Sequence, residues 1–212
     1  QCEDRAGSKS THVGSGFHCA PGIVCTDRHV LDCPEGAALV RINLHRVVGE
    51  EDATGDDATE MPPPFYTIQD NAIAESQISR HPDRDLAKIK LANAGPGISS
   101  MPLLRWKESP VNTGDLGHAY TLSMSYPLGF TAPYAQIGAL ENRTDNRLDN
   151  ARTFEFSTTN DLDIGSAGSP IVDLDGQVIG VIVPSPPGPP ASSGRATGTG
   201  TRAIDASLLS AF

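Results

Sequence analysis

Short apolar segments recur along this chain at close spacing, and this pattern limits the possible folds more than any other feature. Residues 38–45, ALVRINLH, alternate apolar and polar side chains with a period of two, which is typical of a half-buried strand. Turns rich in glycine and proline separate such segments, and the turn DLDG at residues 173–176 predicts a hairpin. About ten strand-like segments without strand–helix alternation predict an all-β protein, built as barrels or as a sandwich.

The end of the chain departs from the strand pattern. Residues 205–212 read DASLLSAF, and Asp205 is suited to cap a short C-terminal helix. The 212 residues are 38% hydrophobic, which is enough for one large core or two small ones. No apolar run reaches about 18 residues, so we expect no membrane contact through a spanning segment. The chain begins at Gln1 without a signal-peptide pattern, so we expect a processed form or an excised domain, and its localisation stays open.

The chain is acidic, with 26 Asp and Glu residues against 16 Lys and Arg residues and a net charge of −10. An acidic surface repels phosphate backbones, which argues against nucleic acid as a partner. Residues 49–60, GEEDATGDDATE, hold many of the acidic side chains. Their spacing is not that of an EF-hand loop, so we predict a solvated loop there and no metal site.

The four cysteines are Cys2, Cys19, Cys25 and Cys33. Their even number permits two disulfides, and Cys19 and Cys25 flank a turn across which they can face each other. Four thiolates can also hold a structural zinc ion, although the chain has no C-x₂-C pair. Buried free thiols are the third alternative. The sequence leaves all three open, and we expect the three later cysteines to lie near His29, which they bracket.

Three places in the chain carry residues suited to nucleophilic catalysis. His29 ends a predicted strand in CTDRHVL, and Asp85 precedes another in DRDLAKIKL. The third is the turn GSAGSP, in which Gly165 and Gly168 bracket Ala167. A hydroxyl nucleophile needs an imidazole as its base, and the imidazole needs a carboxylate to fix its tautomer. A tight turn can direct backbone N–H groups at an oxyanion. The order of these elements therefore indicates a hydrolase site whose nucleophile position holds alanine.

These stretches resemble the trypsin-like serine peptidases, and most of all the bacterial branch that includes HtrA proteases and relatives of glutamyl endopeptidase. The similar segments are GSGFHCAPGIVCTDRHVL, DLAKIKL, GDLGHAYTLSMSYPLGF, GSAGSPIVDLDGQVIGV and GTGTRAIDASLLSAF, which extend from Gly14 to Phe212. The resemblance implies one peptidase domain over residues 1–212, made of two six-stranded antiparallel β-barrels. These barrels would span about 11–95 and about 110–205, with the site in the cleft between them.

The resemblance also implies a role for each site residue. His29 is the general base, Asp85 is its orienting carboxylate, and Ala167 stands at the nucleophile position. The backbone N–H groups of Gly165 and Ala167 form the oxyanion hole. No cofactor is implied, and the partner is a protein or peptide substrate, together with other domains of a longer parent protein.

The alanine departs from the family pattern G-x-S-G-[GS]-P. Ser166 and Ser169 do not substitute for a nucleophile at position 167, because a shift along a tight turn moves the hydroxyl out of reach of the base. We therefore expect a serine endopeptidase captured in an inactive form by a Ser-to-Ala change. The alternative is a natural pseudoprotease that binds peptides or partners. The chain also lacks an Ile-Val-Gly-Gly start, so we expect regulation by other parts of a longer protein rather than a zymogen switch.

By the same resemblance, residues 160–165 and 181–185 line the primary substrate pocket. The candidate substrate-binding residues are Asp161, Val183 and Ser185. Asp161 lies six residues before Ala167, at the spacing of the pocket aspartate of trypsin, and it would favour Arg or Lys through a charge-assisted contact. Asp163 competes for this role. A glutamyl preference is disfavoured, because Ile182 stands where relatives with that preference carry histidine.

Overall fold

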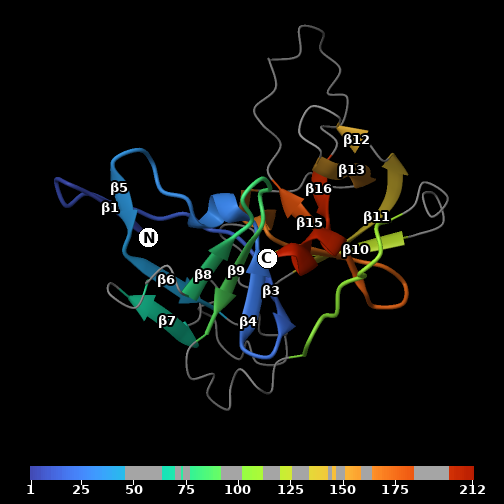
Figure 1. Cartoon of the computed structure of the whole chain (residues 1–212), viewed down its shortest axis with the longest axis horizontal. Helices are drawn as coiled ribbons and strands as arrows, with labels where there is room; N and C mark the ends of the chain where they lie inside the picture. The colour runs from blue at the N-terminus through green and yellow to red at the C-terminus, as the bar shows by residue number, and fades with distance from the viewer. Residues whose placement is uncertain are drawn as a thin grey trace, which may run out of the picture.

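The computed structural model describes residues 1–45, 64–69, 73, 77–91, 102–111, 120–125, 134–142, 145–146, 151–158, 164–183 and 201–212. Over these ranges the chain is mostly β-strand, with short 3-10 helices, in agreement with the predicted all-β class. The acidic segment 49–60 lies outside the described residues, so its predicted loop is not described. In Figure 1, the blue and green strands of the N-terminal half lie on one side and the yellow to red strands of the C-terminal half on the other.

Three antiparallel sheets form in the N-terminal half, with the strand orders β2-β1-β5, β3-β4-β9-β8 and β6-β7. Their strands are β1 (Cys2–Asp4), β2 (Lys9–Ser10), β3 (Gly16–Ala20), β4 (Ile23–Thr26), β5 (Ala37–Leu39), β6 (Arg41–Leu44), β7 (Tyr66–Gln69), β8 (Ile78–Arg80) and β9 (Ala87–Lys90). The first 3-10 helix, η1 (Arg28–Leu31), follows β4 directly.

The four-stranded sheet β3-β4-β9-β8 separates two hydrophobic cores. On one face, Ile89 pairs with both Val24 and Ile78, and this row packs with residues of β6 and β7. On the other face, Phe17 and Cys25 join the core of the C-terminal half. Because successive side chains of a strand point to opposite faces, the period-two pattern of these strands supplies both cores.

One large antiparallel sheet forms in the C-terminal half, with the order β11-β10-β14-β15-β16-β13-β12. Its strands are β10 (Tyr120–Ser125), β11 (Tyr134–Asn142), β12 (Asp145–Asn146), β13 (Ala151–Thr158), β14 (Pro170–Val172), β15 (Val178–Val183) and β16 (Thr201–Asp205). β11 also pairs with β13, so the sheet closes on itself. A short 3-10 helix, η6 (Ile164–Ser166), precedes β14.

The C-terminal segment forms a 3-10 helix, η7 (Ala206–Ala211), rather than an α-helix. The side chain of Asp205 caps it by accepting a hydrogen bond from the backbone N–H of Ser207 at 2.9 Å. Lys88 of β9 donates to the carbonyl oxygens of Leu209 and Phe212, both at 2.5 Å, which ties the helix to the N-terminal half. Among the described residues, no helix has the length and apolar character needed to cross a membrane.

All four cysteines form disulfides, so the free-thiol and zinc alternatives are wrong for this structure. Cys19 and Cys25 are joined across the β3–β4 hairpin, as their positions beside the turn predicted. Cys2 and Cys33 are joined across a sequence separation of 31 residues. Because Cys33 lies just after η1, this second bond fixes the end of the helix that carries His29 against β1.

Candidate active site

His29 lies on η1, at the point where β4 ends and the chain turns. Asp27 begins this helix as its N-cap, and its Oδ1 accepts a hydrogen bond from the backbone N–H of His29 at 2.8 Å. A carboxyl oxygen is a favourable cap because it satisfies an N–H group that has no partner within the first turn. The His29 side chain is 60% exposed, so one face of the imidazole is open to a ligand.

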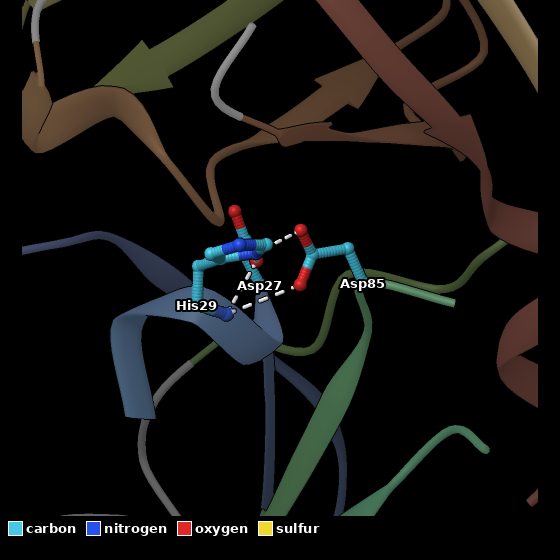
Figure 2. Close-up of side chains that lie close together, drawn as sticks. All are labelled: Asp27, His29 and Asp85. Carbon is cyan, nitrogen blue, oxygen red and sulfur yellow. Dashed lines mark hydrogen bonds and ion pairs between the residues drawn. The ribbon is translucent and has the colours of Figure 1, made fainter. Parts of the chain in front are cut away.

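Asp85 lies two residues before β9 and contacts His29 through its side chain. Its Oδ2 meets His29 Nδ1, and its Oδ1 accepts a second hydrogen bond from the His29 backbone N–H at 3.2 Å. The backbone joins the two segments as well, because Arg28 donates to the Asp85 carbonyl at 3.4 Å. Figure 2 shows the Asp85 carboxyl group beside the edge of the His29 ring, with the Asp27 carboxyl group behind the ring in this view. The structure therefore brings together two of the three predicted site residues from positions 56 apart.

The turn that contains Ala167 is held by the segment before β3. Ser15 donates twice to it, from its backbone N–H to the Ala167 carbonyl and from its hydroxyl to the Gly165 carbonyl, both at 2.7 Å. Thr26, at the end of β4, donates from its hydroxyl to the Ser15 carbonyl at 2.6 Å. This chain of hydrogen bonds joins the turn to the strand that leads into η1.

The turn also lies next to the start of η1. A methyl group built on Gly168 would stand 3.0 Å from the backbone nitrogen of Asp27, which is two residues before His29. In Figure 2, the loop between η6 and β14 passes close to the His29 ring, which agrees with this contact. The three parts of the predicted site therefore lie in one region of the molecule.

The carbonyl of Ser166 determines the direction of the neighbouring N–H group. This carbonyl accepts from the Ser169 N–H at 3.0 Å, inside the turn. The described peptide bonds are all trans, so the N–H of Ala167 is antiparallel to the Ser166 carbonyl and points away from the turn interior.

The two serines beside Ala167 are both buried. Ser166 is 1% exposed and Ser169 is 0% exposed, whereas Ala167 is partly exposed. A hydroxyl that solvent cannot reach is equally closed to a peptide substrate. This burial agrees with the expectation that neither serine replaces a nucleophile at position 167.

The predicted substrate-pocket residues are only partly described. Asp161 and Ser185 lie outside the described residues, as does Asp163. Val183 ends β15, where it pairs with Arg202 of β16 and is 4% exposed in the core. Its side chain therefore packs inside the protein.

Asp27 is a site residue that the sequence analysis missed. It is fully buried, with 0% exposure, and its Oδ1 lies 3.8 Å from His29 Nδ1. Burial and then the negative charge of Asp85 raise the pKa of Asp27 to about 8. The sequence offers one signal for Asp27: it directly follows the mostly buried strand IVCT, where an ionised side chain is costly.

The same three side chains have the proximity expected of metal ligands. Asp27, His29 and Asp85 each offer one ligand atom, and these atoms lie within 4.8 Å of one another. The Nδ1 atom of His29 is, however, already paired with the Asp85 carboxylate. A metal ion bound at this nitrogen would have to displace that contact, so we interpret the cluster as a hydrogen-bonded pair with a second carboxyl group.

Comparison with known proteins identifies the family. The sequence profile of the trypsin-like peptidase domain matches residues 14–181. The chain belongs to this family. Among curated proteins, this trypsin-like peptidase domain is similar to a probable periplasmic serine endoprotease, DegP-like, from Chlamydia pneumoniae. The two are 26% identical over 177 residues, which cover 82% of this chain and 29% of that protein. The chain therefore spans less than a third of the length of this relative.

Solved structures show the same fold. An HtrA-type protease, AlgW, solved with a decapeptide, is 19% identical, with 92% of this chain and 48% of that chain covered and a TM-score of 0.59. The active form of the Rv3671c protease from M. tuberculosis is also 19% identical, with 93% and 70% covered and a TM-score of 0.57. The predicted trypsin-like family is confirmed, and HtrA-type and DegP-like proteins are among its relatives.

Proposed function

We propose that this trypsin-like peptidase domain is a serine endopeptidase whose catalytic triad is His29, Asp85 and residue 167, present here with alanine at the nucleophile position. The observation that carries the proposal is the contact between His29 Nδ1 and Asp85 Oδ2, next to the glycine-bracketed turn. The proposed domain has two β-barrels, over about 11–95 and about 110–205, with the site between them. Its partners are protein or peptide substrates.

The proposed reaction starts with a serine hydroxyl at position 167. Its oxygen attacks the substrate carbonyl carbon as its proton passes to Nε2 of His29, while Asp85 holds the proton on Nδ1 and stabilises the imidazolium. The negative charge that develops on the carbonyl oxygen is stabilised by the backbone N–H groups of Gly165 and residue 167. The imidazolium then gives its proton to the leaving amine, and an acyl-enzyme remains. Water, activated by His29, hydrolyses this ester and regenerates the hydroxyl.

With Ala167 in place, the first step has no nucleophile. The methyl group cannot form the acyl-enzyme, and burial keeps the hydroxyls of Ser166 and Ser169 away from a substrate. The backbone donors of the turn do not depend on the side chain at 167. The chain in its present form is therefore proposed to bind peptides without cleaving them.

A covalent probe tests the proposed triad. We expect a fluorophosphonate to label the Ala167→Ser variant at residue 167, because this probe reacts with a serine that a neighbouring base activates. The present chain, and Ala167→Ser combined with His29→Ala, should remain unlabelled. The readout is the intact mass, with the labelled peptide identified after digestion. A folded Ala167→Ser variant without label, or labelling that persists in the His29→Ala combination, contradicts the proposal.

A natural pseudoprotease is the second candidate, and Ala167 itself is the observation that favours it. Such a protein would use the same site to hold peptides or partners. The codon at position 167 of the source gene separates the two functions. A serine codon supports the peptidase, and an alanine codon supports the pseudoprotease.

We also propose that the restored enzyme cleaves after Arg or Lys, with Asp161 as the pocket carboxylate. The support is the six-residue spacing between Asp161 and Ala167 and the family resemblance. In a peptide library, Ala167→Ser should prefer basic residues, and adding Asp161→Ala should lower kcat/KM for them by roughly 10²-fold, because a desolvated charge pair is lost. Asp163→Ala is the matched control. A preference for small apolar residues that Asp161→Ala does not change contradicts this assignment.

A further inference from the structure

A second carboxyl group lies at the His29–Asp85 pair, and the proposed reaction does not use it. Asp27 is fully buried where β4 leads into η1. Its Oδ1 accepts from the His29 N–H at 2.8 Å, but its buried Oδ2 accepts from no donor in the described part of the chain. A buried carboxylate oxygen without a donor is costly, so the position needs a physical explanation.

The two carboxyl groups converge on one atom. Asp85 Oδ1 accepts from the same His29 N–H, at 3.2 Å, so oxygen atoms of Asp27 and Asp85 lie close to each other. Two ionised carboxylates at such a distance repel each other strongly, and the repulsion grows where water is excluded. A proton shared between them removes the repulsion, because one group then donates a hydrogen bond to the other.

The arginine side chains near the site pair with acidic groups other than Asp27. Arg28 Nε lies 3.8 Å from Asp85 Oδ1 and 3.4 Å from Asp32 Oδ2, and Arg80 also pairs with Asp32. Within the described ranges, no Arg or Lys side chain pairs with Asp27. The turn at residues 165–169, which packs against Asp27 from the C-terminal half, contributes no titratable side chain. The titratable groups near Asp27 are therefore His29 and Asp85, with which it interacts directly, and Asp32, while Arg28 pairs with Asp32 and Asp85.

The titration of Asp27 agrees with this geometry. Burial is the main cause that raises its pKa to about 8, and the charge of Asp85 and a side-chain hydrogen bond with Asp85 act in the same direction. Asp32 adds a smaller effect of the same sign. We assign the proton to Asp27 rather than to Asp85, because Asp27 is fully buried whereas the Asp85 side chain is 18% exposed.

We propose that Asp27 is a positioning residue of the active site: its neutral carboxyl group donates a hydrogen bond to Asp85 and thereby holds the Asp85 carboxylate against His29. This inference rests on the proposed function, because the pair that Asp27 supports is the proposed base and its orienting carboxylate. When Asp27 ionises, the donor is lost and a second negative charge faces the imidazole. The two carboxylates then repel each other, so Asp85 is no longer held against His29 and the imidazole loses its orientation. Activity of the restored enzyme then falls as the pH rises through the titration of Asp27.

The first test measures the thermal stability of the present chain and does not require enzymatic activity. Because the folded-state pKa of Asp27 exceeds its ordinary value of 3.8, the folded chain keeps a proton that the unfolded chain releases between pH 4 and pH 8. Stability from this group is therefore fully present below about pH 4 and falls as the pH rises to about 8. Asp27→Asn imitates the neutral acid, so its Tm should exceed that of the parent by an amount that grows to roughly 5–10 °C at pH 8. Asp175→Asn, which removes the same charge at an exposed position in the turn between β14 and β15, should keep the slope of the parent.

The second test measures the reaction in the Ala167→Ser background. Asp27→Ala should lower kcat/KM by roughly 10-fold or more at neutral pH, because Asp85 loses its donor. Asp27→Asn should recover most of that loss and should remove the decline above about pH 8, because asparagine donates at every pH.

The two tests separate this inference from the proposed function. If Ala167→Ser does not hydrolyse peptides, the proposed function fails, and the Tm comparison still decides whether Asp27 carries the proton. If Asp27→Asn has the same dependence of Tm on pH as the parent, or if it keeps the alkaline decline in kcat/KM, the positioning role is overturned.

Discussion

Replacing Ala167 with serine is expected to raise peptide hydrolysis by roughly 10⁴–10⁶-fold over the present chain, the largest effect that a single change in this protein should have. The reason is that the proposed base, its orienting carboxylate and the turn at position 167 already lie together. His29 contacts Asp85, the imidazole is largely exposed, and the Ala167 N–H points out of the turn. The missing part is one oxygen atom. The measurement is kcat/KM on a fluorogenic peptide library at neutral pH.

Three matched variants keep this result interpretable. In the Ala167→Ser background, Ser166→Ala and Ser169→Ala should leave the proposed nucleophile as the reacting hydroxyl, because both side chains are buried. His29→Ala should return the rate close to that of the present chain. Hydrolysis that survives His29→Ala would come from a contaminant or from a different mechanism. Hydrolysis by the present chain at a comparable rate would show that position 167 is not the nucleophile position.

Local signals in the sequence predicted the hairpins of this fold well. The turn at Pro21 and Gly22 joins β3 to β4, and Gly22 has the positive φ of 71° that a tight turn of this kind demands. The DLDG turn joins β14 to β15 in the same way, with Gly176 at a φ of 76°. Both predictions depended on residues within a few positions of each other. The Cys19–Cys25 disulfide was accessible for the same reason, since its cysteines flank one of these turns.

Interactions between distant residues were accessible only through the order of the candidate catalytic residues and the family resemblance, or not at all. The resemblance gave His29 and Asp85 as a pair, and the structure places them in contact. Nothing in the sequence indicated that Ser15 holds the turn 150 positions later, or that Cys2 pairs with Cys33. Such contacts depend on the register of whole strands and on how the two halves pack, and no short motif encodes either of these.

Asp27 shows a different limit of the sequence. Its position beside His29 was visible, but an acidic residue near a strand end is most often a solvated cap or a turn residue. The role proposed for Asp27 follows from its complete burial and from its proximity to Asp85, which lies two residues before β9. Burial of a single polar residue follows from tertiary packing, so it could not be read from the alternation pattern of β4.

Gly168→Ala is expected to destabilise the fold by about 3–5 kcal/mol, and the cause lies in two separate costs. Gly168 has a φ of 88°, in the left-handed region that side chains other than glycine rarely adopt. A methyl group at this position would also stand 2.1 Å from the Ser15 carbonyl oxygen and 2.4 Å from Thr26 Oγ1. These atoms belong to the hydrogen bond between Thr26 and Ser15, so they cannot move apart without breaking it.

Gly176→Ala provides the control, because it adds the strain of the left-handed backbone without the steric contacts. Gly176 has a φ of 76°, and a methyl group built on it meets no atom within 4 Å. Its substitution should cost only about 1–2 kcal/mol, which is the strain of the left-handed conformation alone. Chemical denaturation of both variants measures the difference in the free energy of unfolding, and equal losses would show that the contact with Ser15 does not contribute to it.

In the Ala167→Ser background, Gly168→Ala should also abolish hydrolysis while Gly176→Ala retains it. The methyl group can be accommodated only if the turn moves away from Ser15, and that movement carries residue 167 away from His29.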